Sequence, residues 1–370
     1  MRNRFLLVAL ALIATACSGG AEDTTTTTST TIASTTTSEA TTTTNETTST
    51  TVDDRPRSPV NGLPVDDPEL LDRRVVAVKV DNHWNARPQS GILEADAVFE
   101  IRVEGGLTRF MAVFHQSDTE MLGPIRSGRP SDAALVRPLE AVLAISGGQP
   151  WIRNGINGVG VDYMSDTRPG MFRVPDRAAP HNLYGNTLEL REVATERGVP
   201  DDPPPVSLWD FGALEAEGEE ASHVSFTFSD TTTTEWTWDG TTYWRSIDSQ
   251  ESNWINSDGE SERINADLLI AIVGEQYTAS PPGGASGSPV PATSSTGSGP
   301  FYLFTEGQVV EGTWAREDPS QPFELTTADG EVLPIPSGRP WISVIPDVGT
   351  VEFDNPPVTT TSSTATTAGG

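Results

Sequence analysis

The chain has 370 residues and a strong acidic excess, because 52 aspartates and glutamates stand against 23 lysines and arginines and give a formal net charge of −29. Nucleic acids are bound through clusters of lysine and arginine, so this charge excludes nucleic acid as an expected partner. Cys17 is the only cysteine, which excludes a disulfide bond within one chain.

The first sixteen residues have the pattern of a secretion signal. Two arginines precede an apolar run from Phe5 to Ala14, and small residues follow it. The run is shorter than the roughly 20 apolar residues that a membrane-spanning helix needs. The letters ATAC, which end at Cys17, resemble a bacterial lipobox, with plain secretion as the alternative. We expect residues 1–16 to be a lipoprotein signal peptide, and a lipid on Cys17 to hold the extracytoplasmic chain on the outer face of the cell membrane.

Two segments are dominated by threonine and serine. They cover residues 17–55 and 355–370. Segments with so few apolar residues cannot bury enough surface to offset the entropy of ordering. The composition therefore predicts a disordered tether after Cys17 and a disordered tail at the other end.

Residues 60–200 alternate short apolar runs with helix signals. We expect strands at the letters VVAVKVDN, AVFEIRVE, LTRFMAVFHQ and AVLAIS. A short helix is expected at SDAALVRPL, capped by Ser131, and a longer one at NTLELREVATERG, where Asn186 and Glu189 have the spacing of a capping box. This mixture predicts an N-terminal α/β domain.

A proline-rich stretch marks residues 201–221 as a linker, and residues 222–354 then read as strands. Turn signals recur every eight to twelve residues there and helix signals are lacking, which is typical of a mostly antiparallel β domain. Residues 279–299 are rich in Gly, Ser and Pro and are expected to be a flexible loop in it. The fold class predicted for the whole chain is α+β.

The letters VEGGLTRF, residues 103–110, predict a hairpin with a two-residue turn at Gly105 and Gly106. In that register Arg109 shares one face with Glu100 and Glu104 and lies diagonal to both. The two glutamates would be about 13 Å apart along a strand, too far for the carboxylate pair of a glycosidase, which is about 5–9.5 Å apart. A charged sheet face in mutual ion pairs is the alternative to a functional site.

The letters GPIRSGRP place Arg126 and Arg129 just before a predicted helix start. Guanidinium groups beside free helix N–H groups bind carboxylate or phosphate groups well, so these letters predict an anion-binding site. The alternative is that both arginines neutralise Glu100 and Glu104.

His181 lies in the letters APHNLY, next to Asn182 and close to Tyr184. A histidine there could act as a general base or donate a hydrogen bond to a ligand, and an anchoring role in the loop is the alternative. No metal-ligand or nucleophile motif accompanies it. The tryptophans of the β domain could stack on sugar rings or pack in the core.

Stretches from both regions resemble one known family. In chain order they read NARPQSG, EADAVFEIRVEGGLTRFMAVF, GPIRSGRP, SGG and APHNLY, and then TTYWRSID, GSGPFYLFTEGQVVEGTWARE and PIPSGRPWISVIP. They are similar to the YerB-like lipoproteins, a bacterial family classed as a domain of unknown function, over about residues 63–347. The resemblance agrees with a lipid anchor at Cys17 and implies no activity.

These patterns favour a non-enzymatic envelope lipoprotein that binds an anionic or cell-wall ligand, or an envelope protein. The candidate ligand-binding residues are Arg87, Arg109, Arg126, Arg129, His181, Asn182 and Tyr184. A second hypothesis is a hydrolase or transferase for cell-wall material, with Glu100, Glu104 and His181 as catalytic candidates. A third is a purely structural interaction module. No cofactor or metal is expected.

Overall fold

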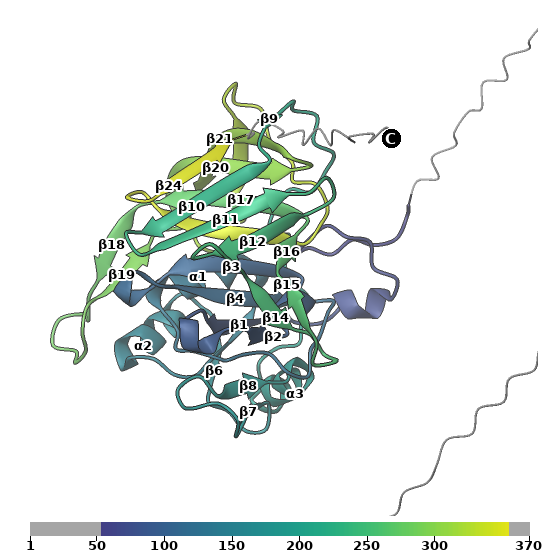
Figure 1. Cartoon of the computed structure of the whole chain (residues 1–370). Coiled ribbons are helices and arrows are strands. Elements are labelled where there is room, and N and C mark those ends of the chain that lie inside the picture. Colours follow the sequence, from purple (N-terminus) through teal and green to yellow (C-terminus); the bar gives the residue numbers. More distant parts are fainter. Residues whose placement is uncertain (1–52, 355–370) are drawn as a thin grey trace, which may run out of the picture. The chain divides into compact units, whose positions relative to one another are not determined.

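A computed structural model describes residues 53–354 of the protein (Figure 1). The predictions for the signal peptide, for Cys17, for the tether as far as residue 52 and for the tail lie outside the described residues. The three α-helices of the described part are α1 (Pro130–Val136), α2 (Pro150–Gly158) and α3 (Thr187–Glu196). The short 3-10 helices are η1 (Pro68–Leu71), η2 (Trp84–Ala86), η3 (Ile92–Glu94), η4 (Glu104–Gly106) and η5 (Arg137–Leu139).

An eleven-stranded mixed sheet runs through the described part of the chain. Its order is β22-β21-β20-β17-β23-β3-β4-β1-β5-β6, and β9 pairs with β21. The strands are β1 (Val76–Asp81), β3 (Ala97–Arg102), β4 (Thr108–Phe114), β5 (Val142–Ile145), β6 (Tyr163–Ser165), β9 (Glu219–Glu220), β17 (Leu268–Gly274), β20 (Gly297–Thr305), β21 (Gln308–Arg316), β22 (Glu324–Thr327) and β23 (Pro340–Pro346).

Four smaller sets of strands complete the fold. The six-stranded sheet contains β10 (His223–Ser229), β11 (Thr232–Trp238), β12 (Tyr243–Ile247), β13 (Gln250–Glu251), β16 (Asn265–Ala266) and β24 (Thr350–Asp354). The others are β2 (Gln89–Ser90) with β14 (Asn253–Ile255) and β15 (Ser261–Arg263), β7 (Met171–Arg173) with β8 (Leu183–Gly185), and β18 (Gln276–Ala279) with β19 (Val290–Thr293). The predicted α+β class is confirmed, with helices and mixed strands first and mostly antiparallel strands after them.

The central sheet joins the two regions that the sequence suggested. Strand β3 of the first region pairs in parallel with β23 of the second, with Val98 opposite Trp341 and Ile101 opposite Val344. A hydrophobic cluster packs on each face of the sheet, and each cluster draws residues from both regions. The two regions therefore share one sheet and both of its cores.

Two segments differ from the sequence expectation. In residues 201–221, expected to be a linker, Leu208 and Trp209 are buried in the core. The expected flexible loop 279–299 contains β19 and the start of β20, because Val290 and Ala292 alternate toward the core and are buried. Both segments are ordered because their apolar side chains are buried against the rest of the protein.

The turn between β3 and β4 corrects the predicted hairpin register. The backbone N–H of Val103 donates to the carbonyl of Leu107, so three residues form the turn instead of two, and Gly105 and Gly106 have φ angles of 71° and 74°. Ile101 now lies opposite Arg109. A one-residue shift turns a side chain to the other face of a sheet, so the predicted ladder of Glu100 and Arg109 on one face is wrong.

Helix ends follow the sequence signals in part. The side chain of Asn186 accepts hydrogen bonds from the backbone of Leu188 and Glu189, as its capping position predicts. Helix α1 starts one residue before the expected cap, at Pro130, and the carboxylate of Asp132 accepts from the backbone N–H of Arg129. None of the helices within residues 53–354 is long and apolar enough to cross a membrane.

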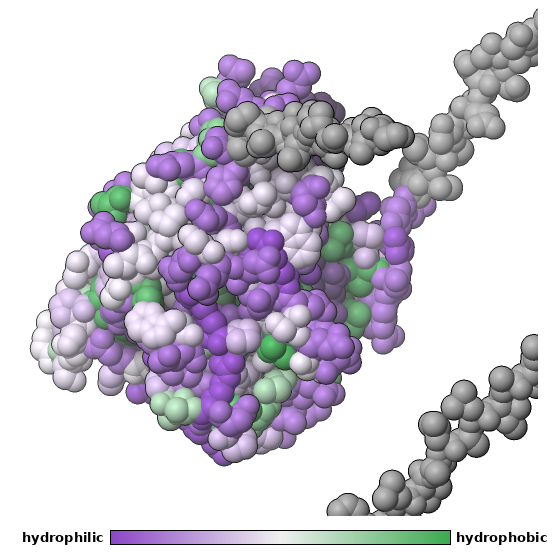
Figure 2. Space-filling model, in the orientation of Figure 1, coloured by the Kyte–Doolittle hydropathy of each residue, from purple (hydrophilic) through white to green (hydrophobic). Residues whose placement is uncertain are grey.

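The visible surface is largely hydrophilic. Figure 2 shows hydrophilic residues over most of the face in view, with hydrophobic residues in small separate patches. Most of the tryptophans of the predicted β domain are core residues, since Trp236, Trp314 and Trp341 are at most 1% exposed and Trp254 is buried. The exposed tryptophan is Trp84, at 63%.

Candidate functional site

The carboxyl ends of three parallel strands meet at one edge of the central sheet. Strand β5 pairs in parallel with both β1 and β6, so Asp81, Ile145 and Ser165 end neighbouring strands. In open sheets with parallel strands, ligands bind beyond these ends. The antiparallel strand β4 brings Arg109 to the same edge, directly opposite Asp81.

Asp81 is the centre of this edge and is almost fully buried. Its Oδ2 atom lies 2.7 Å from Nδ1 of His181 and 3.0 Å from Nε of Arg126. Its Oδ1 atom accepts a hydrogen bond from the backbone N–H of His83 at 3.2 Å. An ionised carboxylate can only accept, so Nδ1 of His181 carries the proton and Nε2 is the free ring nitrogen.

A second histidine lies against the first. The rings of His83 and His181 are stacked with their centroids 4.9 Å apart. Burial, followed by the neighbouring His181, lowers the pKa of His83 below its ordinary value. Both stacked histidines are hydrogen-bonded to the Asp81 carboxylate, His181 through Nδ1 and His83 through its backbone N–H.

Two further arginines lie beside Asp81 and converge on one carbonyl. Arg109 donates from Nη1 to the carbonyl oxygen of Ser127 at 2.8 Å, and Arg129 donates to the same oxygen at 3.3 Å. Arg129 also donates from Nε to Glu104 at 2.6 Å. Burial, and then the positive charge of Arg129, lowers the pKa of Arg109 to about 10, so Arg109 is still charged at neutral pH.

We call Asp81, Glu104, Arg109, Arg126, Arg129 and His181 the arginine cluster. Its three guanidinium groups outnumber its two carboxylates, in a chain whose acidic residues exceed its basic ones by more than two to one. The nearby Lys79 adds no net charge, because it forms a buried ion pair with Asp132 at 2.6 Å. The cluster is therefore a local positive site in an acidic protein.

Arg126 has unused hydrogen-bonding capacity. Within residues 53–354 its side chain forms an ion pair with Asp81. The contact at Nε does not have the geometry of a hydrogen bond, and the side chain is 22% exposed. Arg191, elsewhere in the fold, donates to Asp118 and to the carbonyls of Arg74 and Phe114. Arg191 is saturated by the protein, whereas the guanidinium of Arg126 forms no hydrogen bond with any residue between 53 and 354.

Comparison with known proteins places the chain in a family. Residues 60–200 match the model described as "Protein of unknown function (DUF3048) N-terminal domain", and residues 224–342 match the corresponding C-terminal domain. The chain belongs to the DUF3048 family. This confirms the resemblance inferred from the sequence.

One relative and its crystal structure are similar over most of the chain. The chain is 29% identical to "Putative lipoprotein YerB" of Bacillus subtilis (strain 168) over 300 residues, which are 79% of this chain and 87% of that protein. The crystal structure of YerB matches with a TM-score of 0.67 and 24% identity, covering 80% of this chain and 100% of that one. The structural match supports the fold.

In this DUF3048 protein, several sequence-predicted residues lie together and others do not. Glu104, Arg109, Arg126, Arg129 and His181 are members of the arginine cluster. The remaining candidates, Arg87, Glu100, Asn182 and Tyr184, are outside it.

Each of the four outlying candidates has a separate environment. Glu100 is fully buried on the opposite face of the sheet, where it pairs with Arg245 at 2.8 Å. Arg87 bonds to Asn82 on that same side. Asn182 accepts from Arg173 on the β7–β8 hairpin, and Tyr184 is 1% exposed.

No sequence motif marked Asp81, which is a member of the cluster, or His83, whose ring stacks on that of His181. Both follow the apolar letters VVAVKV, at the point where a strand gives way to polar residues. A polar residue at the carboxyl end of a parallel strand is a signal for a ligand site. The signal was hidden because the parallel pairing of β1 with β5 is a tertiary feature. No three His, Cys, Asp or Glu side chains in the described part of the chain are placed to hold a metal ion.

Proposed function

We propose that this DUF3048 protein is a lipoprotein of the bacterial cell envelope that binds an anionic ligand at the arginine cluster. The lipoprotein assignment is supported by the name of the relative YerB and by the lipobox-like letters that end at Cys17. The ligand class is a phosphate or carboxylate group, such as those carried by cell-wall polymers or by the acidic side chains of an envelope protein.

The observation that carries the proposal is the open fork of Arg126 beside two more guanidinium groups. Guanidinium forks match phosphate and carboxylate groups in a bidentate manner. Arg109 is largely withdrawn from water, which makes its interaction with neighbouring charges stronger than on the surface. A bound anion would offset the mutual repulsion that contributes to the lowered pKa of Arg109.

A second candidate function, hydrolysis or group transfer on cell-wall material, is supported by one contact. Asp81 fixes the ring of His181 through Nδ1, which is how a carboxylate orients a histidine that acts as a general base through Nε2. Of the two glutamates that the sequence suggested beside His181, Glu100 is fully buried and paired with Arg245, and Glu104 is paired with Arg129 at 2.6 Å. The base would be His181, and water would be the acceptor.

The binding proposal is tested by calorimetric titration of the full-length, detergent-solubilised protein with inorganic phosphate and with citrate. Arg126→Ala should weaken binding by about tenfold or more, because a hydrogen bond to a charged group contributes about 1.5–3 kcal/mol. The matched control is Arg173→Ala, which removes a surface arginine paired with Asp166. Equal affinities of wild type and Arg126→Ala, or no binding by wild type, would contradict the proposal.

The anchor is tested independently of the ligand. Cells supplied with a labelled fatty acid should incorporate the label into the wild-type protein and not into Cys17→Ser. The unlabelled variant should leave the membrane fraction. Label that persists in Cys17→Ser would remove the lipid anchor from the proposal and leave the anion site untouched.

A further inference from the structure

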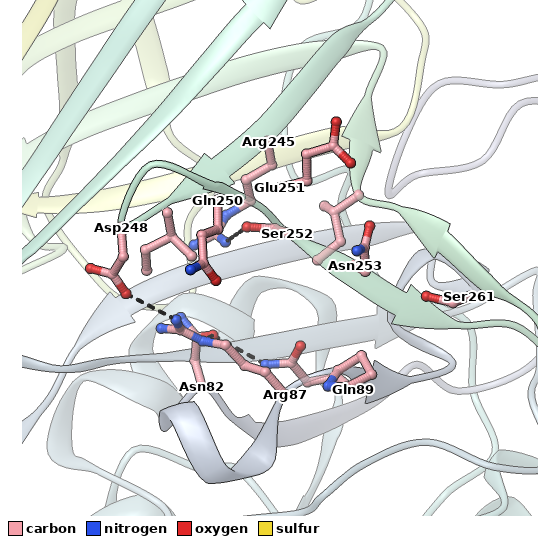
Figure 3. A pocket seen from close by; sticks show the side chains of 13 residues that line it. Asn82, Arg87, Gln89, Arg245, Asp248, Gln250, Glu251, Ser252, Asn253 and Ser261 are labelled. Atoms are coloured by element: carbon pink, nitrogen blue, oxygen red, sulfur yellow. Dashed lines mark hydrogen bonds and ion pairs between the residues drawn. The ribbon is translucent and has the colours of Figure 1, made fainter.

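A polar cavity of about 330 Å³ lies on the other side of the sheet from the arginine cluster (Figure 3). Asn82 directly follows Asp81, and its side chain is directed to the opposite face, where it donates to Thr108 at 2.8 Å. The cavity has the size of a small-ligand pocket, since such pockets measure about 300–1,000 Å³. The cavity is therefore a separate site from the arginine cluster.

Both family regions build this cavity. The first region contributes Asn82, Arg87 and Gln89, and the second contributes residues from 245 to 264. Strand β14 pairs in parallel with β2, with Trp254 opposite Gln89 and Ile255 opposite Ser90, and this strand pairing joins the two walls. Figure 3 shows Arg87 on one wall directed toward Asp248 on the other. The cavity exists only where the two regions are folded against each other.

The charges around the cavity are balanced, in contrast to those of the arginine cluster. Arg87 pairs with Asp248 at 3.3 Å, and Arg245 pairs with Glu100 at 2.8 Å. Glu251 faces Arg263 at 3.5 Å. Each cation that lines the cavity has a carboxylate partner, so no unpaired charge there recruits an ion.

The rest of the lining combines amide and hydroxyl groups with a few apolar side chains. The neutral polar residues are Asn82, Gln89, Gln250, Ser252, Asn253 and Ser261, and the apolar ones are Pro88, Ile247 and Ile264. Amides and hydroxyls both donate and accept hydrogen bonds. Sugar hydroxyls need both kinds of partner, while the C–H faces of a sugar ring need apolar contact. This set of groups is complementary to a polyhydroxylated, uncharged molecule.

We propose that this cavity binds a short neutral glycan. Four of its polar side chains are rigidly placed, because Arg245, Gln89, Asn82 and Ser252 are each less than 9% exposed. They form one hydrogen-bonded chain with Glu100, in which Arg245 donates to Ser252 at 2.7 Å and Gln89 donates to Asn82 at 3.1 Å. A preformed polar floor of this kind binds a ligand with little reorganisation.

The test is a titration of the full-length, detergent-solubilised protein with N,N′,N″-triacetylchitotriose and with maltotriose, two uncharged oligosaccharides. Asp248→Ala should weaken binding of the preferred sugar at least tenfold. Asp248 is 68% exposed but has a φ of 54°, so circular dichroism should first establish that the variant is folded. The matched control is Asp258→Ala, at an exposed turn outside the cavity, and it should bind the sugar as the wild type does.

A second measurement locates the ligand without any variant. Methyl resonances of Ile247 and Ile264, which line the cavity, should shift on addition of the oligosaccharide and stay in place on addition of inorganic phosphate. Absence of binding to both oligosaccharides would overturn the proposal. Equal sugar binding by the wild type and Asp248→Ala would also overturn it. The proposal would fail as well if an uncharged capped trialanine peptide shifted these methyl resonances and neither sugar did.

Discussion

The Oδ2 atom of Asp81 lies 2.7 Å from Nδ1 of His181, although 100 residues separate the two in the chain. The same oxygen forms the ion pair with Arg126. The loop that carries His181 is tied down next to this contact, because Arg177 donates to the carbonyls of Ala86 and Pro88 at 2.9 and 2.8 Å. One buried carboxylate thus joins a strand end, the segment before α1 and the loop before β8.

Replacing Asp81 should therefore destabilise the protein. Asp81→Ala removes the ion-pair partner of Arg126 and the hydrogen-bond partner of His181 and of the backbone N–H of His83, and the loss of a buried partner costs about 1–3 kcal/mol. The free energy of unfolding in urea measures this loss. Asp66→Ala is the control, because Asp66 is 88% exposed and pairs with Arg55 on the surface, where an ion pair contributes about 0–1 kcal/mol. Equal losses in the two variants would argue against a structural role of Asp81.

The buried pair of Glu100 and Arg245 should be among the most sensitive contacts of the fold. Both side chains are at most 1% exposed, and Glu100 also accepts from the indole of Trp341 at 3.0 Å. Glu100→Gln leaves a buried guanidinium uncompensated, and we expect a loss of about 3–5 kcal/mol in the free energy of unfolding.

A double-mutant cycle checks the origin of that loss. The double variant Glu100→Gln and Arg245→Met removes both charges, so it should lose less stability than Glu100→Gln alone, as measured by urea unfolding. The exposed Glu251→Gln should change stability by about 0–1 kcal/mol, because its pair with Arg263 is partly solvated. Strict additivity of the Glu100 and Arg245 substitutions would contradict the expected coupling.

His115 should make stability depend on pH. Burial, together with nearby Arg191 and Arg73, lowers the pKa of His115 to about 4, against a hydrogen bond between Nε2 and the carbonyl of Arg73 that raises it. The unfolded imidazole has a pKa of about 6.5, so between pH 6.5 and 4 the unfolded chain binds a proton that the native state does not. The contribution is complete above pH 6.5 and is lost as the pH falls toward 4, on the order of 3 kcal/mol in total.

The measurement is urea unfolding at a series of pH values between 7 and 4. His115→Gln should flatten the decline in stability over this range relative to the wild type, because the titrating group is gone. Asp96, whose pKa is raised by burial and which accepts from the backbone of His115, is present in both proteins and cancels in the difference. Parallel pH profiles for the two proteins would show that His115 is not the source.

The two glycines of the β3–β4 turn should respond differently to alanine. Both have positive φ angles, so a Cβ atom at either position costs about 1–2 kcal/mol of backbone strain. A Cβ at Gly105 meets open space, whereas a Cβ at Gly106 would meet the hydroxyl groups of Thr231 and Ser229. Thermal unfolding should show a clearly larger loss of stability for Gly106→Ala than for Gly105→Ala, and equal losses would contradict the close approach seen in the structure.

The turn also shows why the sequence predicted a hairpin at the right place with the wrong register. The Gly-Gly pair correctly marked the turn, but a three-residue turn replaced the two-residue one. Normally the apolar face of a strand identifies the register, since one face is buried and the other is exposed to solvent. Here Phe99 packs in one core and Val98 in the other, so both faces of β3 are buried and the alternation of residues carries no register information.

The sequence by itself determined the α+β class, the positions of most strands in the first region, the cap at Asn186 and the family, because these depend on local patterns and on chain-order motifs. The lipobox-like letters at Cys17 are equally local. Only the tertiary structure decided which charged residues meet. Asp81, Arg109, Arg126 and His181 come from four separate segments, and hydrogen bonds and ion pairs act over a few ångströms. Their convergence depends on strand pairing and register. The amino-acid sequence alone does not determine these when both faces of a sheet are buried.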